Sequence, residues 1–575
     1  MKKLLILALL LLGAAGAAFY FMRSSSPAAA DYYADYLPEN TLATASFVDL
    51  QGLSETFPAT SLGHFVAKPT VHRILGEIGV PPQGLKEYDD VYDGLAGVMT
   101  NPAFRQVFGD DAVVAVLPPD VELLRKDPEK ELKKSLLVFG TSSVAGPLDS
   151  FARLVMSKNV GKETVEGLEL TRIEVDDNDV VYGYAKKGVV ILSYAPANIV
   201  RAMQQKEAGS GLREFAFFTA AKGFWTKKAA TQRIYTRSYV NFTRIRSLFS
   251  ESMNPQEREI GKYLQGFKSM SSVMVEDHDT LEMSTQLEYT FDELHPWVRD
   301  QYKAVSKQNY SLGLLSNKSL VYYWVSLLNK DYLKNLLAAA NEDQYKQIDS
   351  QVRKELGVSL DECIAAVGPQ LGLVVNDVVN TGLFPLPKAV FFLEVRDPAI
   401  AQKLFDTLRK RIAERGFATE QHEQVNGKTI YYWSILPGEA TQLALVLTDK
   451  MVYLANGKAS LKLVLDPKYK QTELPAGMAE TLGSDLVKSV KSSNYTTVVA
   501  RPALLATQVR EGITWLAGML EATRGITAEQ LKKEILSLME SVDVVTATSN
   551  IAREHTVSSI VFQKAEAADN TAGKE

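Results

Sequence analysis

The chain has 575 residues, with 63 Lys and Arg against 68 Asp and Glu, a formal net charge of −5, and 46% hydrophobic residues. These proportions are those of an ordinary folded protein and exclude a collagen-like, disordered or polytopic membrane chain. The mild acidic balance gives no reason to expect nucleic acid as a partner.

Residues 1–30 have the features of an export signal. Two lysines at positions 2 and 3 precede an uncharged apolar run from 4 to 22, and Ala28-Ala29-Ala30 before Asp31 offers a cleavage site. The run is longer than the usual signal core of about 7–15 residues and is long enough to span a bilayer. The segment therefore predicts either a cleaved signal or a retained single-span anchor. The rest of the chain would then lie at the periplasmic face of a bacterial inner membrane, or be released after cleavage near Ala30.

Short alternating runs rich in Val, Ile and Tyr predict the strands of the first half. They are 43–48, 111–117, 135–139, 168–175, 180–184, 189–194, 233–240, 273–276 and 281–289. Helical segments lie between strands. Asp397 before Pro398 predicts a helix that runs to 415, and Thr527 with Gln530 predicts a capping box for a helix that ends at Met539.

The same order of elements occurs twice in the chain. Residues 37–42 before a strand resemble 315–320, and three later pairs are matched: 107–109 with 366–368, 136–139 with 390–393, and 188–193 with 450–455. Because the last three matches have offsets of 259, 254 and 262, they predict one duplication with small insertions. The expected fold is α+β, with two tandem homologous halves behind one N-terminal membrane helix. Each half, 31–300 and 301–563, would have a mainly antiparallel sheet with covering helices, followed by a polar disordered tail at 564–575.

Several short motifs carry a family resemblance. The start Leu37-Pro38-Glu39-Asn40-Thr41-Leu42 follows the N-terminal membrane segment, and Val48-Asp49-Leu50 and Phe108-Gly109 lie downstream. With this L-P-x-x-T start, the chain resembles an uncharacterised bacterial family of exported, membrane-anchored proteins, known only as a domain of unknown function. The second half departs from the pattern, because Ser316 stands where the first half has Pro38. The resemblance implies localisation and architecture and brings no catalytic residues.

The common catalytic signatures are missing from the sequence. It contains no His-Glu-x-x-His, Gly-x-Ser-x-Gly or Ser-x-x-Lys motif and no glycine-rich phosphate loop. Since zinc proteases, α/β-hydrolases, penicillin-binding proteins and nucleotide enzymes use these motifs, none of these classes is favoured and no cofactor is expected. Cys363, the only cysteine, lies in an apolar stretch and is predicted to be a buried residue rather than a nucleophile.

Two acidic clusters are candidate cation sites. Glu276, Asp277, His278 and Asp279 place three carboxylates around an imidazole, which is a donor set for a divalent ion or for acid–base chemistry. Their position between two predicted strands favours a solvated hairpin turn. The run 176–179 is dense in oxygen ligands, but it lacks the spacing of a calcium loop and also favours a turn.

Two further groups of side chains are candidate sites. His64 and His72 would share a helical face, but Pro69 is expected to interrupt the helix between them. Arginines at 233, 237, 244 and 246 alternate with aromatic residues, a pattern that suits an anionic polymer or lipid headgroups. In a strand followed by a helix, the same pattern is more typical of one polar face beside one core face.

Three function classes follow. The first is a non-catalytic cell-envelope protein whose duplicated domains bind another protein or an envelope component. The second is a carrier or sensor of a lipid or another apolar ligand, because sheets backed by helices can enclose a pocket. The third is an enzyme whose site is assembled from dispersed carboxylates. The expected partners are the membrane, through the N-terminal segment, and an envelope protein or lipid.

Overall fold

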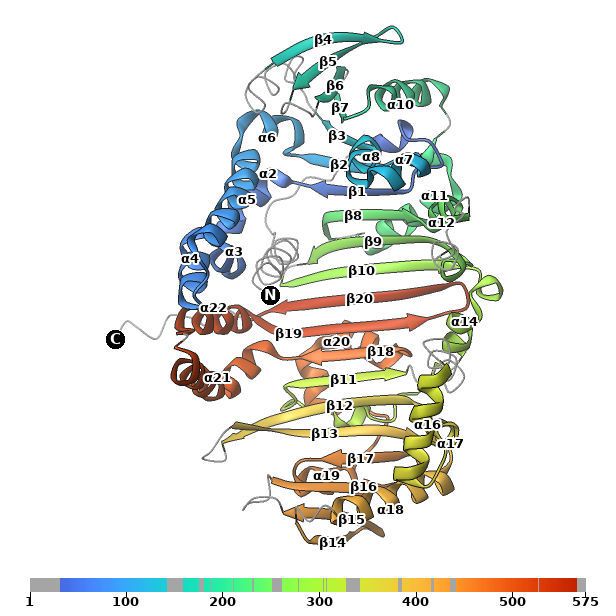
Figure 1. The fold of residues 1–575 in the computed structure, drawn as a ribbon, viewed down its shortest axis with the longest axis vertical. Helices are drawn as coiled ribbons and strands as arrows, with labels where there is room; N and C mark the ends of the chain where they lie inside the picture. Colours follow the sequence, from blue (N-terminus) through green and yellow to red (C-terminus); the bar gives the residue numbers. More distant parts are fainter. Residues whose placement is uncertain are drawn as a thin grey trace. The chain divides into compact units, whose positions relative to one another are not determined.

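A computed structural model describes residues 31–565 except 142–158, 175–179, 187, 210, 230–231, 251–260, 278, 304, 307, 327–341, 381–384, 415–417, 435–440 and 526. The predicted membrane segment at 1–30 and most of the polar tail lie outside these residues. The fold is α+β, and the chain forms two compact units (Figure 1). The first unit is Met1–Glu293 with Leu520–Leu538, and the second is Leu294–Met519 with Met539–Glu575.

The first unit has an antiparallel sheet with the strand order β4-β5-β6-β7-β3-β2-β1-β8-β9-β10. Its strands are β1 Ala43–Val48, β2 Asp111–Val116, β3 Leu136–Thr141, β4 Asn159–Val165, β5 Leu168–Glu174, β6 Val180–Lys186, β7 Val189–Ser193, β8 Arg233–Asn241, β9 Phe267–Asp277 and β10 Thr280–Tyr289. The predicted strands of this half are confirmed, with ends that agree within two residues, except that β9 begins six residues before the predicted 273. The polar edge strand β4 was not predicted.

The second unit has an antiparallel sheet with the order β14-β15-β16-β17-β13-β12-β11-β18-β19-β20. Its strands are β11 Val321–Ser326, β12 Val367–Asn380, β13 Pro385–Val395, β14 Glu420–Val425, β15 Lys428–Ser434, β16 Gln442–Leu447, β17 Met451–Ala455, β18 Thr496–Ala500, β19 Val542–Ile551 and β20 His555–Lys564. Strand for strand, this is the order of the first unit.

The strand registers allow position-by-position comparison of the two sheets. Ser46 of β1 pairs with Val113 of β2, and Trp324 of β11 pairs with Gly372 of β12. Aligning these two pairs gives an offset in residue number of 278 between β1 and β11 and of 259 between β2 and β12. Continuing across, the registers align Phe139 with Phe392. This is one residue from the match made on sequence, and the difference matters because a one-residue slip moves every side chain to the opposite face of the sheet.

Helices cover the sheets and fill the connections between strands. In the first unit they are η1 Tyr32–Asp35, α2 Leu50–Thr56, η2 Phe57–Ala59, α3 Ser61–Val66, α4 Lys68–Glu77, α5 Pro82–Thr100, α6 Pro102–Phe108, α7 Val121–Lys126, α8 Pro128–Lys134, α10 Pro196–Ala208, η3 Leu212–Glu214, α11 Ala216–Lys228, α12 Phe242–Ser250 and η4 Phe291–Glu293. In the second unit they are α14 Pro296–Lys303, η5 Leu312–Leu314, α16 Glu342–Leu356, α17 Leu360–Ala366, α18 Pro398–Glu414, α19 Lys458–Val464, α20 Ala476–Ser492 and α21 Pro502–Arg524, of which residues 520–524 belong to the first unit.

Each unit has its main core on one face of its sheet. In the first unit, Tyr33, Leu37 and Phe218 pack onto strand residues such as Val113 and Tyr239. In the second unit, the main core is built around Tyr322, Trp324 and Phe392, with residues of α19 and α20. Side chains alternate between the two faces of a strand, so the neighbouring residues Tyr323 and Phe391 point to the other face.

Both predicted helices are confirmed, the second as residues 529–540, but only the first has its predicted cap. The helix after Asp397 is confirmed: α18 begins at Pro398, and the Asp397 carboxylate accepts from the backbone N–H groups of Ala399 and Ile400. The capping box at Thr527 is wrong, because the Gln530 N–H donates to the Glu77 carboxylate at 3.0 and 3.1 Å. The cap comes from a residue distant in sequence.

The segment α22 Glu529–Glu540 explains why residues 520–538 group with the first unit. Leu531 and Leu538 pack against the buried residues Leu62, Phe65 and Ile74 of α3 and α4. The predicted boundary near residue 300 did not anticipate this return of the chain, because apolar periodicity shows that a helix has a buried face without showing what covers it.

Candidate functional site

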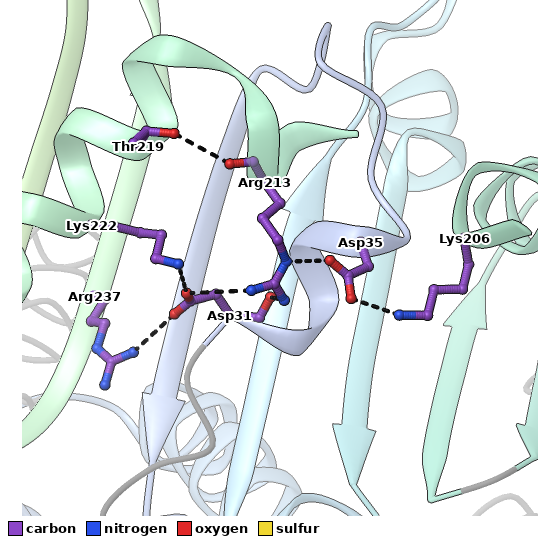
Figure 2. A network of polar contacts seen from close by, with 7 residues as sticks. All are labelled: Asp31, Asp35, Lys206, Arg213, Thr219, Lys222 and Arg237. Carbon is purple, nitrogen blue, oxygen red and sulfur yellow. Dashed lines mark hydrogen bonds and ion pairs between the residues drawn. The ribbon is translucent and has the colours of Figure 1, made fainter. Parts of the chain in front are cut away.

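The described residue Asp31 lies at the centre of a network of ion pairs in the first unit (Figure 2). Asp31 precedes η1 in the left-handed conformation, with φ of 62°, and is 6% exposed. Its carboxylate lies 2.7 Å from Lys222 Nζ of α11 and 3.6 Å from an Arg237 nitrogen of β8. Arg213 of η3 donates to the Asp31 carbonyl at 2.8 Å. Three elements distant in sequence therefore hold this residue.

Asp35 extends the network to the other end of η1. Its carboxylate pairs with Arg213 and, at 2.6 Å, with Lys206 of α10 (Figure 2). Lys206 also lies over the ring of Tyr36, 5.3 Å from its centre. Burial acts to raise the pKa of Asp35, but the hydrogen bonds from Lys206 and Arg213 outweigh it and hold the pKa below its usual value.

Asp111, the first residue of β2, faces the same side of the sheet as Arg237. Its Oδ1 is buried and has no hydrogen-bond partner among the described residues, and the same holds for Tyr32 Oη and Arg237 Nε. Burial raises the pKa of Asp111 to about 7; the Arg237 guanidinium opposes this shift, and the carboxylates of Asp110 and Asp31 add to it. A buried carboxyl group with an unsatisfied oxygen is costly unless it takes up a proton.

The second unit has neutral groups at the corresponding positions. The registers align Asp111 with Gln370 and Arg237 with Thr497, and the offset of 278 aligns Asp31 with Asn309. All three second-unit residues are buried. The same place in the two sheets is therefore ionic in one unit and neutral in the other.

Both amides of the second unit have hydrogen-bond partners at the oxygen and at the nitrogen. Gln370 accepts from Trp324 Nε1 and from the backbone N–H of Tyr310, both at 3.0 Å, and donates to Ser306 at 2.9 Å. Asn309 donates to Tyr322 Oη at 2.9 Å and accepts from Ser311. Such satisfied networks fix a core without any need for proton uptake.

The predicted candidate cation site does not come together in the described residues. The Glu276 carboxylate accepts a hydrogen bond from the Tyr235 hydroxyl of β8. Asp277 is the last residue of β9, and the Thr280 hydroxyl donates to its backbone carbonyl at 3.0 Å. His278 and the run 176–179 lie outside the described residues. Among the residues described, no group of three or more His, Cys, Asp or Glu side chains is placed to hold a metal.

The two histidines and the cysteine considered from the sequence do not form a site with one another. Ala67 is extended and separates α3 from α4, so His64 and His72 lie on different helices, as predicted from Pro69. His72 pairs with the Asp89 carboxylate at 2.7 Å. Cys363 is half-buried rather than buried. Burial raises the pKa of its thiol, and Glu362 and Asp349 add to the rise. These conditions disfavour a reactive thiolate.

The four arginines do not form one basic surface. Arg233 pairs with Asp49 and lies over the ring of Tyr235, and Arg244 lies 3.3 Å from a Glu39 oxygen. Arg237 is buried beside Asp31, as described above. Arg237 shares the buried face of β8 with Tyr235 and Tyr239, so the expected separation into a polar face and a core face is wrong at this residue.

A surface cleft of about 480 Å³ lies in the first unit between the loop before β1, the loop after β2 and α12. Its lining includes the charged residues Asp120, Glu122 and Arg244 beside two prolines. Charged walls of this kind do not favour an apolar ligand in this cleft.

Sequence reasoning missed Asp31, Asp111 and Arg237 as one group because they lie 80 and 126 residues apart along the chain. One signal was available: extending the repeat upstream at the offset of 278 places Asp31 opposite Asn309, a change from charge to amide at a buried position.

Comparisons with known proteins give no identification. No family model matches the chain, and no curated protein matches it. The solved structures with partial likeness include crystal form III of TP0453, at 10% identity and a TM-score of 0.20 over 46% of this chain and 80% of that chain. Crystal form I of TP0453 has the same identity and TM-score over 45% and 80%. A likeness at this TM-score carries no argument. Among the described helices, none has the length and hydropathy required to cross a membrane.

Proposed function

We propose that this is a non-catalytic cell-envelope protein that binds a partner protein through duplicated α+β domains. In this proposal residues 1–30 export the chain and tether it to the membrane, and the two units descend from one ancestral half. The shared strand order and matched registers of the two sheets support duplication, since ten strands rarely follow the same non-sequential order by chance. Membership of the uncharacterised exported family is part of the same proposal.

One feature carries the binding proposal: an apolar row across the face of the second-unit sheet opposite the main core. It consists of residues paired across six strands, namely Phe391, Leu373, Tyr323, Val498, Ala547 and Ile560. Phe391 is 53% exposed, Ile560 38% and Tyr323 36%. Large apolar side chains gathered on a surface are typical of an interaction site.

The fold itself does not require this row. At the corresponding positions the first unit has small or hydroxylated residues and two valines: Val138, Val114, Ala45, Ser238, Ser272 and Thr285. The same backbone is thus built with a much less apolar surface. The larger side chains of the second unit are therefore better explained by a partner than by sheet formation.

The dimensions of the apolar row suit one kind of partner. Six strands spaced about 4.8 Å apart make a row of roughly 24 Å. An amphipathic helix of about 16 residues has that length and presents an apolar stripe along it. We therefore infer that the partner contributes the apolar face of a helix.

Site-specific photo-crosslinking in intact cells tests this function. A photoreactive phenylalanine analogue replaces Phe391 in one variant and Leu463 in a matched control. Leu463 is 62% exposed but lies on α19, whose neighbours Leu461 and Val464 belong to the core on the opposite face. We expect a discrete protein adduct from position 391 that is absent from position 463 and is lost when Tyr323→Ser and Ile560→Ser are added.

Two results would overturn the proposal. An equal adduct pattern from both positions, or none from position 391, would mean that the apolar row is not a binding surface. An adduct of lipid mass at 391 would replace the protein partner by the second candidate, a lipid carrier, because an acyl chain also fits an apolar row.

A further inference from the structure

The buried ionic group of the first unit stands where the second unit has neutral amides, and this difference has a mechanical consequence. We propose that Asp111 is the proton-operated element of a latch that holds the segment Asp31–Leu37 on the sheet of the first unit. The latch is separate from the apolar row and does not depend on the proposed partner.

The geometry of the latch rests on Arg237. Its side chain is 9% exposed, its guanidinium lies 3.6 Å from the Asp31 carboxylate, and its Nε has no partner among the described residues. Asp111 lies on the same face of the sheet, because it pairs with Val48 of β1 while Arg237 pairs with Ser46, and its Oδ1 is buried without a partner among the described residues.

The groups that face Asp111 come from three directions. Arg237 lies on β8, Asp31 and Tyr32 lie at η1, and Asp110 precedes Asp111 in the chain. Burial raises the pKa of Tyr32 above its ordinary value, so its hydroxyl stays neutral between pH 5 and 9. Lys222 and Arg213 contact Asp31. The raised pKa of Asp111 falls inside that interval.

The sign of the pH effect follows from the raised pKa. With the segment seated, the pKa of Asp111 is about 7, against an ordinary value of 3.8. The seated state therefore binds the proton more tightly than a loosened, solvated state. Seating is strongest below the ordinary value of 3.8 and weakens as the pH rises towards 7, because only the loosened state is ionised in that interval; it levels off above 7, where Asp111 is charged in both states.

Hydrogen exchange of the full chain tests the latch with an internal control. Peptides covering 31–42 and 309–320 are compared at pH 5.5 and 8.5 after correction for intrinsic exchange rates. Both segments have matching bonds: Leu42 N–H donates to the Val116 carbonyl, and Leu320 N–H to the Val375 carbonyl. We expect protection of 31–42 to fall roughly thirtyfold between pH 5.5 and 8.5, because the loosened state is already ionised over the roughly 1.5 pH units that separate 5.5 from the seated pKa of about 7, while 309–320 does not respond.

Variants separate the latch from general loosening. Asp111→Asn supplies a permanently neutral group, as Gln370 does in the second unit, and is expected to abolish the fall in protection. The exposed carboxyl variant Asp90→Asn should behave as the wild type. The latch is overturned if 31–42 and 309–320 respond equally to pH in the wild type, a comparison that needs no variant to fold. It is also overturned if Asp111→Asn keeps the full pH response.

Discussion

At the scale of single residues, the described structure distinguishes ion pairs that organise the fold from those that decorate its surface. Asp31 and Arg237 have side chains only 6% and 9% exposed, so their interaction is poorly screened by solvent. Lys162 and Glu169 are closer, at 2.6 Å, but both are more than 60% exposed. Burial decides the importance of a pair more than distance does, because removal of one partner leaves the other charge desolvated.

This difference predicts unequal costs of substitution. Arg237→Met is expected to destabilise the first unit by about 3 kcal/mol, because Asp31 would keep a buried charge with fewer partners. Lys162→Met should cost less than about 1 kcal/mol, as exposed pairs usually do. The loss in free energy of unfolding of each variant is measured by urea titration, with hydrogen exchange of the β8 amides as the probe. Equal costs would show that the Asp31 network does not organise the core of this unit.

At the scale of elements, α22 depends on a contact that its own sequence does not contain. The Glu77 carboxylate accepts from the N–H of Gln530 in the first turn, where unpaired N–H groups and the helix dipole favour a negative charge. Leu531 and Leu538 then bury their side chains against α3 and α4. The helix is thus fixed at its start and along one face.

Glu77→Ala is therefore expected to loosen the start of α22 at a cost of about 1–2 kcal/mol. Limited proteolysis should show faster cleavage near residue 530 in this variant. Glu87→Ala, an exposed glutamate on α5, is the control and should be cut at the wild-type rate. Wild-type cleavage of Glu77→Ala would mean that packing alone holds the helix.

The elements also show what the sequence could and could not predict. Alternating strands such as 43–48 were predicted well because their residues face core and surface in turn. β4, with the sequence Asn-Val-Gly-Lys-Glu-Thr-Val, was missed because an edge strand with two exposed faces needs no apolar alternation. The helix cap at Gln530 and the Asp31 network were missed for a different reason. Both are assembled from segments far apart in the chain, and local patterns contain no such information.

At the scale of the whole molecule, the two units have the same strand order but differ in one buried group and in one exposed row of side chains. The first unit has a charged buried group where the second has satisfied amides. The second has an exposed apolar row where the first has mostly small and hydroxylated residues. We attribute both differences to the duplication proposed above, in which a stable frame is kept while a few positions acquire a separate role.

The most direct test of the binding account is native mass spectrometry of the full-length protein, gently extracted from its own envelope. The account predicts a discrete additional protein mass on the wild type and on Leu463→Ser, and its loss in a Tyr323→Ser/Phe391→Ser variant that remains folded. A bare wild-type mass, or an additional mass that survives in the double variant, would contradict a partner bound at the apolar row.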